Sequence, residues 1–425
     1  MARISISISL CFWLSLASPL LAQSAFRRGD VNADGALDIS DPVSLLLSLF
    51  AGAPPSGCLA AGDIDDSGVL DTTDAVVLLQ HLFKAGPPPA APYPDCGTDP
   101  SDEEGAGALG CEAHAPCAAD GDPIITEWTV PWARSRPRDP YVGPDGRVWF
   151  VGQNADYAAH LETDSGEFTR FDLPEGAGPH NLIVGPAHVW YAGNGDGHIG
   201  KLDPVSGEID VLEMPDSSAF DPHTLVFDQG GDIWFTVQVG NFVGKLTTAT
   251  DSVRLIEVPT SNARPYGIIV DPQNYPWFVE FGTNKLARID RDTFAIEEHT
   301  LPRSGARPRR IGVTSDGAIW YVDYAFGYLG RFTPSTGAFK EWQAPGGAES
   351  EPYGMAVDHR DRIWFVETGP NPNRFVGFDP RTESFFSEVD VPSGGGNIRH
   401  MYFHPPLREI WFGTDTNTIG RARVE

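Results

Sequence analysis

Two short segments near the start of the chain gather oxygen-bearing side chains at a spacing that suits a divalent cation. In the first segment, GDVNADGALDISD, loop positions 1, 3, 5, 7, 9 and 12 are Asp30, Asn32, Asp34, Ala36, Asp38 and Asp41. The second segment, GDIDDSGVLDTTD, repeats the pattern with Asp63, Asp65, Ser67, Val69, Asp71 and Asp74. Position 7 offers its backbone carbonyl, and the glycine at position 6 allows the sharp turn that such a loop needs. The spacing predicts two bound Ca2+ ions, one in each loop.

A second set of reactive side chains recurs in repeats between residues 122 and 425. One member follows a recurrent proline or its equivalent, and these residues are Tyr141, His180, His223, Tyr266, Arg309 with Arg310, Tyr353 and His400. Another member lies three residues after a recurrent tryptophan, where the acids are Glu280, Asp323 and Glu367. Glu351, directly before one of the prolines, adds a further carboxylate. The repeats agree elsewhere and differ here, and differences confined to one rim of a repeat protein indicate a ligand site.

The repeats themselves are marked by tryptophans at a nearly constant spacing. The motif in RVWFV, HVWYA, DIWFT, YPWFV, AIWYV, RIWFV and EIWFG places Trp149, Trp190, Trp234, Trp277, Trp320, Trp364 and Trp411 between 41 and 47 residues apart. This is the period of a β-propeller blade, and each repeat holds four short apolar runs separated by Gly, Asp or Pro. We expect a mainly β protein, with a seven-bladed β-propeller of four-stranded blades over residues 122–425. The tryptophans are expected to pack between blades and not to bind ligand.

The two ends of the repeat region complement each other. The last repeat stops without its outermost strand, and IITEWTVP at residues 124–131 reads as an outermost strand that has no blade of its own. The N-terminal strand is therefore expected to close the last blade, which removes free sheet edges. In such a ring the starts of the innermost strands and the ends of the second strands surround one mouth of the central channel. The variable residues named above would meet there.

Each calcium loop leads into an apolar run that predicts one helix. The apolar positions are Val43, Leu46, Leu47 and Phe50 after the first loop, and Val76, Leu79, Leu82 and Phe83 after the second. Carboxylates gathered so closely repel one another, so we expect this small α-helical, EF-hand-like module at residues 26–86 to fold only with calcium. The duplicated loop and helix unit resembles a type I dockerin. The resemblance implies a cohesin-like protein partner.

The N-terminus and the cysteines indicate export. Residues 1–22 read as a signal peptide, with a membrane anchor as the alternative, and no other segment is a candidate membrane span. Four cysteines then remain, Cys58, Cys96, Cys111 and Cys117, and three disulfide pairings are open. Proximity favours Cys58 with Cys96 and Cys111 with Cys117. Residues 87–121, rich in Pro, Gly and acids, are predicted to be a linker. We expect a monomeric protein that is secreted or held at the cell surface.

The net charge of −28 excludes two classes of partner. Nucleic acids and anionic membranes would repel a chain with 58 acidic and 30 basic residues. The ligand of the propeller is instead expected to be a small molecule, a peptide or a glycan.

The wording of the repeats resembles the virginiamycin B (streptogramin) lyases over nearly all of residues 124–425. The shared pattern includes P-Y-G-I, I-W-F-x-E, N-K-I-G-R-I-D and E-x-x-L-P. The resemblance implies a seven-bladed propeller and a carbon–oxygen lyase that opens a cyclic depsipeptide by elimination at its ester. It also implies that a Glu-Pro-His segment and a later Glu carry the chemistry, with Mg2+ on the carboxylates and the His as base. Glu351 and Glu367 match the two carboxylates here, and Tyr353 stands at the position of the His.

No single blade carries both carboxylates and a histidine. His223 follows an acid but lacks the later Glu, and His400 lacks both carboxylates. A Mg2+ ion held by Glu351 and Glu367 could be served by His400 from the neighbouring blade. His400, Tyr353 and His223 are therefore the candidate catalytic residues.

Three functions remain open on this evidence from the residues. The first is a metal-assisted lyase at the propeller rim, with hydrolysis as a less favoured reaction. The second is a non-catalytic extracellular propeller that binds a glycan, peptide or protein. Its calcium-dependent docking module would tether it, for example in polysaccharide breakdown. The third is a purely structural surface protein.

Overall fold

The computed structural model describes residues 26–33, 37–52, 58–84, 86–94, 99, 109, 111 and 122–424. The chain divides into two compact units, residues 1–119 and 120–425. Asp34, Ala36, Cys96, Cys117 and the predicted signal peptide at residues 1–22 lie outside the described residues. None of the described helices is both long and apolar enough to cross a membrane.

The first unit is built from two copies of one loop and helix repeat. Helix α1 (Ser40–Ala51) and helix α2 (Thr72–Lys84) each begin near the end of an acidic loop, and the short 3-10 helix η1 (Leu59–Gly62) lies between them. Val31, Leu45, Ile64 and Leu78 are buried in one core. Val31 and Ile64 share one loop position, and Leu45 and Leu78 share one helix position. Each copy therefore contributes the same side chains to the contact between α1 and α2.

A disulfide in this unit differs from the expected pairing. Cys58 is bonded to Cys111, so the predicted pairs Cys58–Cys96 and Cys111–Cys117 are wrong. The two bonded cysteines face each other in an isolated antiparallel bridge and belong to one buried cluster. After α2 the chain returns to the acidic loops and forms backbone hydrogen bonds with them. This return brings together cysteines that are far apart in the sequence, which their spacing alone does not indicate.

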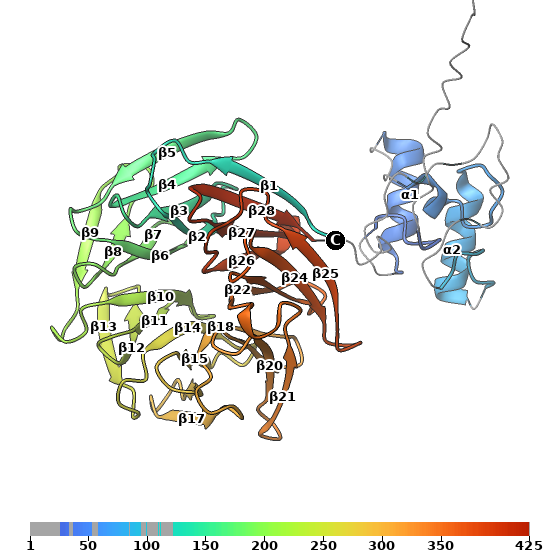
Figure 1. The fold of residues 1–425 in the computed structure, drawn as a ribbon. Coiled ribbons are helices and arrows are strands. Elements are labelled where there is room, and N and C mark those ends of the chain that lie inside the picture. Colours follow the sequence, from blue (N-terminus) through green and yellow to red (C-terminus); the bar gives the residue numbers. More distant parts are fainter. Residues whose placement is uncertain are drawn as a thin grey trace, which may run out of the picture. The chain divides into compact units, whose positions relative to one another are not determined.

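The second unit is a ring of seven four-stranded antiparallel sheets, coloured from teal to red in Figure 1. Blades 1 to 3 consist of β2 (Pro137–Val142), β3 (Val148–Gly152), β4 (Tyr157–Glu162) and β5 (Glu167–Asp172), then β6 (Pro179–Val184), β7 (Val189–Gly193), β8 (His198–Leu202) and β9 (Ile209–Glu213), then β10 (Pro222–Phe227), β11 (Ile233–Val237), β12 (Phe242–Thr247) and β13 (Ser252–Glu257). Blades 4 to 6 consist of β14 (Pro265–Val270), β15 (Pro276–Glu280), β16 (Lys285–Ile289) and β17 (Ile296–Thr300), then β18 (Pro308–Val313), β19 (Ile319–Asp323), β20 (Tyr328–Thr333) and β21 (Ala338–Gln343), then β22 (Pro352–Val357), β23 (Ile363–Glu367), β24 (Arg374–Asp379) and β25 (Ser384–Asp390). In each of these blades the first strand lies innermost, beside the central channel.

The last blade closes the ring with the two ends of the propeller segment. It is formed by β26 (Met401–His404), β27 (Glu409–Gly413), β28 (Thr418–Arg423) and β1 (Ile124–Thr129). Strand β1 pairs with β28 along its whole length, and Figure 1 shows the two strands side by side. The innermost strand β26 lies against β2 of the first blade. The predicted seven-bladed propeller with an N-terminal closing strand is confirmed.

The recurrent tryptophans hold the blades together. All seven side chains are buried, and they contact apolar residues of the next blade, as Trp234 contacts Ile268 and Phe278. In three blades the indole N–H donates to a turn aspartate, from Trp234 Nε1 to Asp228 Oδ2 at 3.3 Å, from Trp277 Nε1 to Asp271 Oδ2 at 2.9 Å and from Trp364 Nε1 to Asp358 Oδ2 at 2.8 Å. The tryptophans therefore form core contacts and leave the channel mouth to other residues.

Candidate functional site

The strand ladders define equivalent positions in the seven blades. In blades 2 to 7 the aromatic residue after the tryptophan faces one residue of the innermost strand, for example Phe278 opposite Ile268 and Phe365 opposite Met355. In the first blade Pro137 faces Gly152 as Pro265 faces Glu280 in the fourth. One position at or just before the start of each innermost strand points to the same end of the channel. It lies two residues before the partner of the aromatic residue, and in the first blade it directly follows Pro137. In chain order its residues are Arg138, His180, His223, Tyr266, Arg309, Tyr353 and Arg399. We call these seven residues the mouth ring. All seven line one cavity of about 320 Å3.

We call this cavity the mouth cup. Its lining consists of the mouth ring together with Arg136, Gln153, Asn194, Gln238, Tyr324 and Asn397. Every lining side chain is polar, charged or a tyrosine, and none is aliphatic. The structure thus brings together His180, His223, Tyr266, Arg309 and Tyr353 of the predicted set.

The first blade departs from the expected alignment of the repeats. Pro137, and not Pro140, faces the last residue of the second strand, as the recurrent proline does in the next five blades. Arg138 therefore takes the ring position, and Tyr141 lies deeper, where it lines a second cavity. The second proline of the segment PRDPY caused the shift of three residues in the sequence-based alignment.

The last blade shows a smaller shift. Met401 faces Phe412, which places Arg399 in the mouth ring and His400 one residue further along the channel. This blade has no proline before its innermost strand, so the sequence offered no fixed point for the alignment. His400 does not line the mouth cup.

The acids at the ends of the second strands do not line the cup either. Glu280, Asp323 and Glu367 are fully buried. Two of them accept backbone N–H groups of the loops between blades, from Arg307 N to Asp323 at 2.8 Å and from Gly346 N to Glu367 at 2.7 Å. Burial raises the pKa of all three carboxyl groups, that of Glu280 to about 7. These acids anchor the loops around the mouth.

In four blades the residue after the end of the second strand reaches the cup instead. Gln153, Asn194, Gln238 and Tyr324 directly follow the last residue of β3, β7, β11 and β19 and line the cavity. Successive side chains of an extended chain point to opposite sides. Of two neighbouring residues at a strand end, one therefore faces the cup and the other faces the loop between blades. The positions predicted from the sequence are the neighbouring ones, so these four residues were missed. Aligning the repeats by their strand ladders, and not by tryptophan spacing alone, identifies them.

The two carboxylates that match the lyase pattern hold separate partners. Glu351 Oε2 accepts the hydroxyl of Tyr324 at 2.8 Å, and Glu367 lies 3.7 Å from Arg374 Nη1. Glu367 Oε2 has no hydrogen-bond partner among the described residues. In residues 122–424 no three His, Cys, Asp or Glu side chains bring ligand atoms within 4.8 Å of one another. Glu351 and Glu367 could therefore supply only part of the six-oxygen shell of Mg2+, and waters would have to supply the rest.

Positive charge dominates the mouth cup. The Arg138 side chain is 4% exposed, and its Nη1 donates to Gln153 Oε1 at 2.8 Å. Its Nε lies 3.7 Å from Asp139 Oδ1, and neither Nε nor Nη2 has a hydrogen-bond partner among the described residues. Arg399 Nη2 and Arg136 Nε lie 2.7 and 3.5 Å from the carboxylate of Asp415. Asp415 is thus the shared carboxylate partner of two of the four guanidinium groups that line the cavity.

The fourth guanidinium is held by aromatic rings. Arg309 lies 3.9 Å from the ring centre of Phe281 and 4.4 Å from that of Tyr324. Its Nη1 donates to Tyr353 Oη at 3.1 Å. Such stacking fixes the planar group while it keeps its charge.

The two ring histidines are neutral at physiological pH. The ring centres of His180 and His223 lie 3.5 Å apart. Burial, and then the charges of nearby arginines including Arg138 and Arg310, hold the pKa of both imidazoles well below the usual value. The positive charge of the cup therefore comes from arginines and does not titrate.

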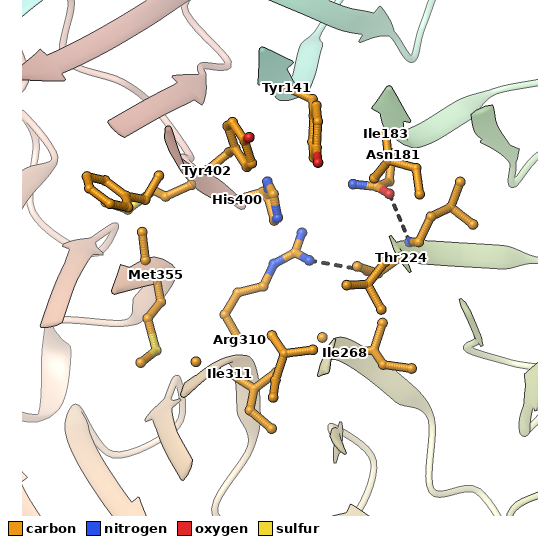
Figure 2. Close-up of a pocket in the computed structure, with 18 of the residues that line it drawn as sticks. Tyr141, Asn181, Ile183, Thr224, Ile268, Arg310, Ile311, Met355, His400 and Tyr402 are labelled. Carbon is orange, nitrogen blue, oxygen red and sulfur yellow. Dashed lines mark hydrogen bonds between the residues drawn. The ribbon is translucent and has the colours of Figure 1, made fainter. Parts of the chain in front are cut away.

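A layer of polar side chains lies one residue deeper in the channel. Arg310 crosses it: Nη2 lies 3.2 Å from Asp139 Oδ2, Nη1 lies 3.2 Å from Thr224 Oγ1, and Nε donates to the Arg399 carbonyl at 2.7 Å. Figure 2 shows the guanidinium between Thr224 and His400. Burial opposes ionisation of Asp139, but the charges of His400, Arg310 and Arg138 outweigh it and hold the pKa at about 2. Burial lowers the pKa of His400 to about 4.

Beyond this layer the channel is lined mainly by apolar side chains. A cavity of about 330 Å3 is lined by later residues of the innermost strands, including Ile183, Ile268, Ile311 and Met355, with Tyr141 at its wall (Figure 2). The Arg310 layer separates this space from the mouth cup, because the cup takes the first residues of the same strands. A polar ligand would therefore meet the mouth cup first.

The acidic loops of the first unit fit calcium in donor chemistry. Asp63, Asp65 and Asp74 bring carboxylate oxygens within 4.8 Å of one another. The last acid of each loop is buried and accepts equivalent backbone N–H groups, from Val31 to Asp41 at 2.8 Å and from Ile64 to Asp74 at 2.7 Å. Oxygen ligands alone are what Ca2+ prefers. In the second loop Ser67, Asp71 and the carbonyl of Val69 would complete the site, and in the first loop Asp30, Asn32 and Asp38 are the described residues that would join Asp41.

Comparison with known proteins agrees with this architecture. The sequence model of the virginiamycin B lyase family matches residues 116–371, which is more than half of the chain. A streptogramin B lyase structure is 27% identical, with a TM-score of 0.65 over 72% of this chain and 98% of that chain. Virginiamycin B lyase from Staphylococcus aureus, 24% identical, has the same fold, with a TM-score of 0.65 over 72% of this chain and 100% of that chain.

The same fold is seen in a catalytically inactive form of the Staphylococcus aureus enzyme with quinupristin, also 24% identical with a TM-score of 0.65 over 72% of this chain and 100% of that one. No curated protein sequence matches the chain. The match of the family model and the seven four-stranded blades agree with each other. This chain belongs to the virginiamycin B lyase family.

Proposed function

We propose that the propeller binds an anionic, hydroxyl-rich ligand in the mouth cup. The observation that carries the proposal is Arg138, a buried guanidinium with two donor groups that have no hydrogen-bond partner among the described residues. A carboxylate, sulfate or phosphate group can accept two hydrogen bonds from such a group at once. Arg136, Arg309 and Arg399 add positive charge around the same cavity.

The remaining lining suits hydroxyl groups. Gln153, Asn194, Gln238 and Asn397 each offer an amide that both donates and accepts hydrogen bonds. No aliphatic residue lines the cup, so it offers little to an apolar side chain of a peptide. An acidic glycan satisfies both the charge and the amides.

Calorimetric titration of the full chain with oligogalacturonate and with a neutral glucose oligomer tests this function. We expect the acidic oligomer to bind and the neutral one not to bind. R138Q and R309Q should each weaken binding at least about tenfold, since a hydrogen bond to a charged group contributes roughly 1.5–3 kcal/mol. The matched control is R147Q, which removes an exposed arginine outside the cup. Equal affinity for both oligomers would refute the proposal.

We further propose that the protein is extracellular and is attached through its first unit. The signal-like segment at residues 1–22 and the disulfide support export. Apolar side chains remain exposed at equivalent positions of α1 and α2, namely Val43 with Val76 and Phe50 with Phe83. This repeated face supports a cohesin-like partner for the calcium-dependent module. Loss of such binding in an F50S/F83S variant, with calcium retained, is the expected result by calorimetry.

A metal-assisted carbon–oxygen lyase is the second candidate. It is favoured by the spacing of Glu351 and Glu367 and by the unpartnered Oε2 of Glu367. Titration with Mg2+ or Mn2+, with calcium present, tests it. Binding that disappears in E351Q and E367Q would support a metal at the rim. If the native protein releases or absorbs no more heat than the two variants, a metal at this site is excluded.

A further inference from the structure

Two tyrosines from separate blades meet at the wall of the mouth cup. Tyr266 lies at the start of β14 and Tyr353 at the start of β22, and their hydroxyl groups share a short hydrogen bond. Arg309, from the blade between them, donates to the Tyr353 hydroxyl at 3.1 Å. Both tyrosines are nearly buried, and both line the cavity. Two phenols and a guanidinium therefore converge at one point of the ligand site.

The surroundings shift the pKa values of the two phenols in opposite directions. For Tyr266, burial opposes ionisation, but the charges of Arg310, Arg138 and Arg309 outweigh it and lower the pKa. For Tyr353, burial and the charge of its partner Tyr266 raise the pKa. A pair of groups whose pKa values are pushed apart can serve as base and acid. This difference favours Tyr266 as the proton acceptor and Tyr353 as the proton donor of the pair.

We propose that this pair makes the mouth cup a site of β-elimination on uronate-containing glycans, with the acid and the base supplied by the two tyrosines. The inference rests on the proposed function, because the cup must first bind the acidic glycan. Carbon–oxygen elimination next to a carboxylate needs three things: neutralisation of the carboxylate, a base for the adjacent carbon, and an acid for the leaving oxygen. The mouth ring supplies each of them.

The step balances without water, oxidant or reductant. The guanidinium groups that line the cup, Arg138 among them, hold the carboxylate of the uronate and withdraw charge from it. The Tyr266 phenolate takes the proton from the carbon that bears the carboxylate. That electron pair forms the carbon–carbon double bond, and the bond from the next carbon to the glycosidic oxygen breaks. Tyr353 gives its proton to this oxygen, and the proton gained by Tyr266 then returns to Tyr353 through their hydrogen bond.

The products are a shortened glycan with a free hydroxyl group and a new chain end with an unsaturated uronate. The experiment incubates the full chain with polygalacturonate, alginate and glucuronan, with calcium present and without Mg2+. We expect ultraviolet absorbance from the conjugated double bond with at least one of them. Mass spectrometry should show products without the water that hydrolysis adds.

Y266F is the decisive variant. Loss of a general base should lower the rate by at least about 100-fold while the dissociation constant for the glycan stays nearly unchanged. Y353F should lower the rate as well, since the leaving oxygen loses its acid. Y141F is the control, because Tyr141 lines the apolar cavity beyond the Arg310 layer and should not alter the rate. Full activity of Y266F would overturn the inference.

The outcomes separate this inference from the proposed function. Binding of polyuronates without unsaturated product leaves the binding function and overturns the elimination. Absence of both binding and product overturns both. Tighter binding of an acidic peptide than of any glycan, or hydrolysed product alone, overturns the elimination and assigns the cup to another ligand or reaction.

Discussion

Arg310 shows how one side chain can close the channel of a propeller. It contacts Asp139 of the first blade, Thr224 of the third and the Arg399 carbonyl of the seventh. Both charged partners are almost fully buried, at 3% and 1% side-chain exposure for Arg310 and Asp139. Removal of one partner of such a pair leaves an uncompensated charge in a medium of low polarity. The two residues therefore depend on each other for the stability of the propeller.

This dependence predicts the effect of R310M. The variant should lower the free energy of unfolding of the propeller by roughly 3–5 kcal/mol, the typical cost of breaking a buried pair. Adding D139N should recover part of the loss, since the carboxylate that has lost its Arg310 partner disappears. Urea denaturation of both variants measures the coupling, with R147M as the surface control. A loss under about 1 kcal/mol for R310M alone contradicts this role, because surface changes reach about half that value.

Glu280 predicts a distinct pH dependence of stability. Burial raises the pKa of its carboxyl group from 4.5 to about 7, so the folded state binds this proton more tightly than the unfolded state. Its contribution is fully present below pH 4.5 and is lost as the pH rises through about 7. E280Q should therefore gain stability relative to the native protein between pH 5 and pH 8, by up to about 2 kcal/mol. Thermal melts across this range measure the gain.

The matched control for this variant is E213Q, since Glu213 is an exposed glutamate on an outer strand. Its melting temperature should follow that of the native protein at every pH. A difference between E280Q and the native protein that stays constant across the range would show that Glu280 is ionised throughout.

At the scale of residues, the sequence predicted the types of side chain that surround the mouth more accurately than their positions. His180, His223, Tyr266, Arg309 and Tyr353 line the cup as expected. Arg138 and Arg399 were missed because prolines, and not strand ladders, set the alignment in the first and last blades. The acids at the strand ends were predicted to line the cup because the predicted position was wrong by one residue. Side chains of an extended chain alternate between its two sides, so this error selects a residue that anchors a loop.

At the scale of elements, β1 carries the closure of the ring. Trp128 of this strand stacks on Trp411 with ring centres 5.6 Å apart, and Arg421 lies 5.1 Å from its ring centre. Glu127 accepts hydrogen bonds from Ser393 and Thr418. These contacts join the two ends of the propeller segment without a covalent bond.

W128A should therefore loosen the ring more than its place on an outermost strand suggests. We expect a loss of about 2 kcal/mol, roughly half of the cost of truncating a fully buried tryptophan, because Trp128 is half-buried. An unpaired edge of β28 also favours self-association, which light scattering during the melt would detect. I124S, on an exposed position of the same strand, is the control. Equal melting temperatures for both variants would place the closure elsewhere.

The elements themselves were the most predictable part of this chain. Tryptophan spacing and turn residues located the blades, and the missing outer strand of the last repeat located β1. The two helices followed from apolar runs after acidic loops. The pairing of Cys58 with Cys111 could not be predicted, since it depends on how the chain returns after α2 and on no local pattern.

For the whole molecule, the two compact units predict two separate unfolding transitions. Calcium bound only to the folded loops would stabilise the first unit by roughly 4 kcal/mol per ion at a thousandfold excess over the dissociation constant. Calorimetric scans of the full chain should show the transition of the first unit with calcium and its loss with EGTA, because this unit is expected to fold only with the ion. The propeller transition should stay in place, because the rim of the described propeller holds no three-acid cluster.

The D41N/D74N variant provides the comparison, since it alters the last acid of both loops. Its scan with calcium should resemble that of the native chain with EGTA. If chelation moves neither transition, the acidic loops fold without the ion and the calcium prediction fails.

The mouth ring also bears on how such a protein can change over evolutionary time. Seven positions out of 425, each at the same place in its blade, set most of the chemistry of the mouth. An exchange at one of them leaves the strand ladders untouched, because the side chain points into the channel and the backbone pairing does not depend on it. A new specificity can thus arise through single substitutions, with no insertion and no redesigned loop. The seven residues of the mouth ring thus determine specificity, and the rest of the propeller holds them in place.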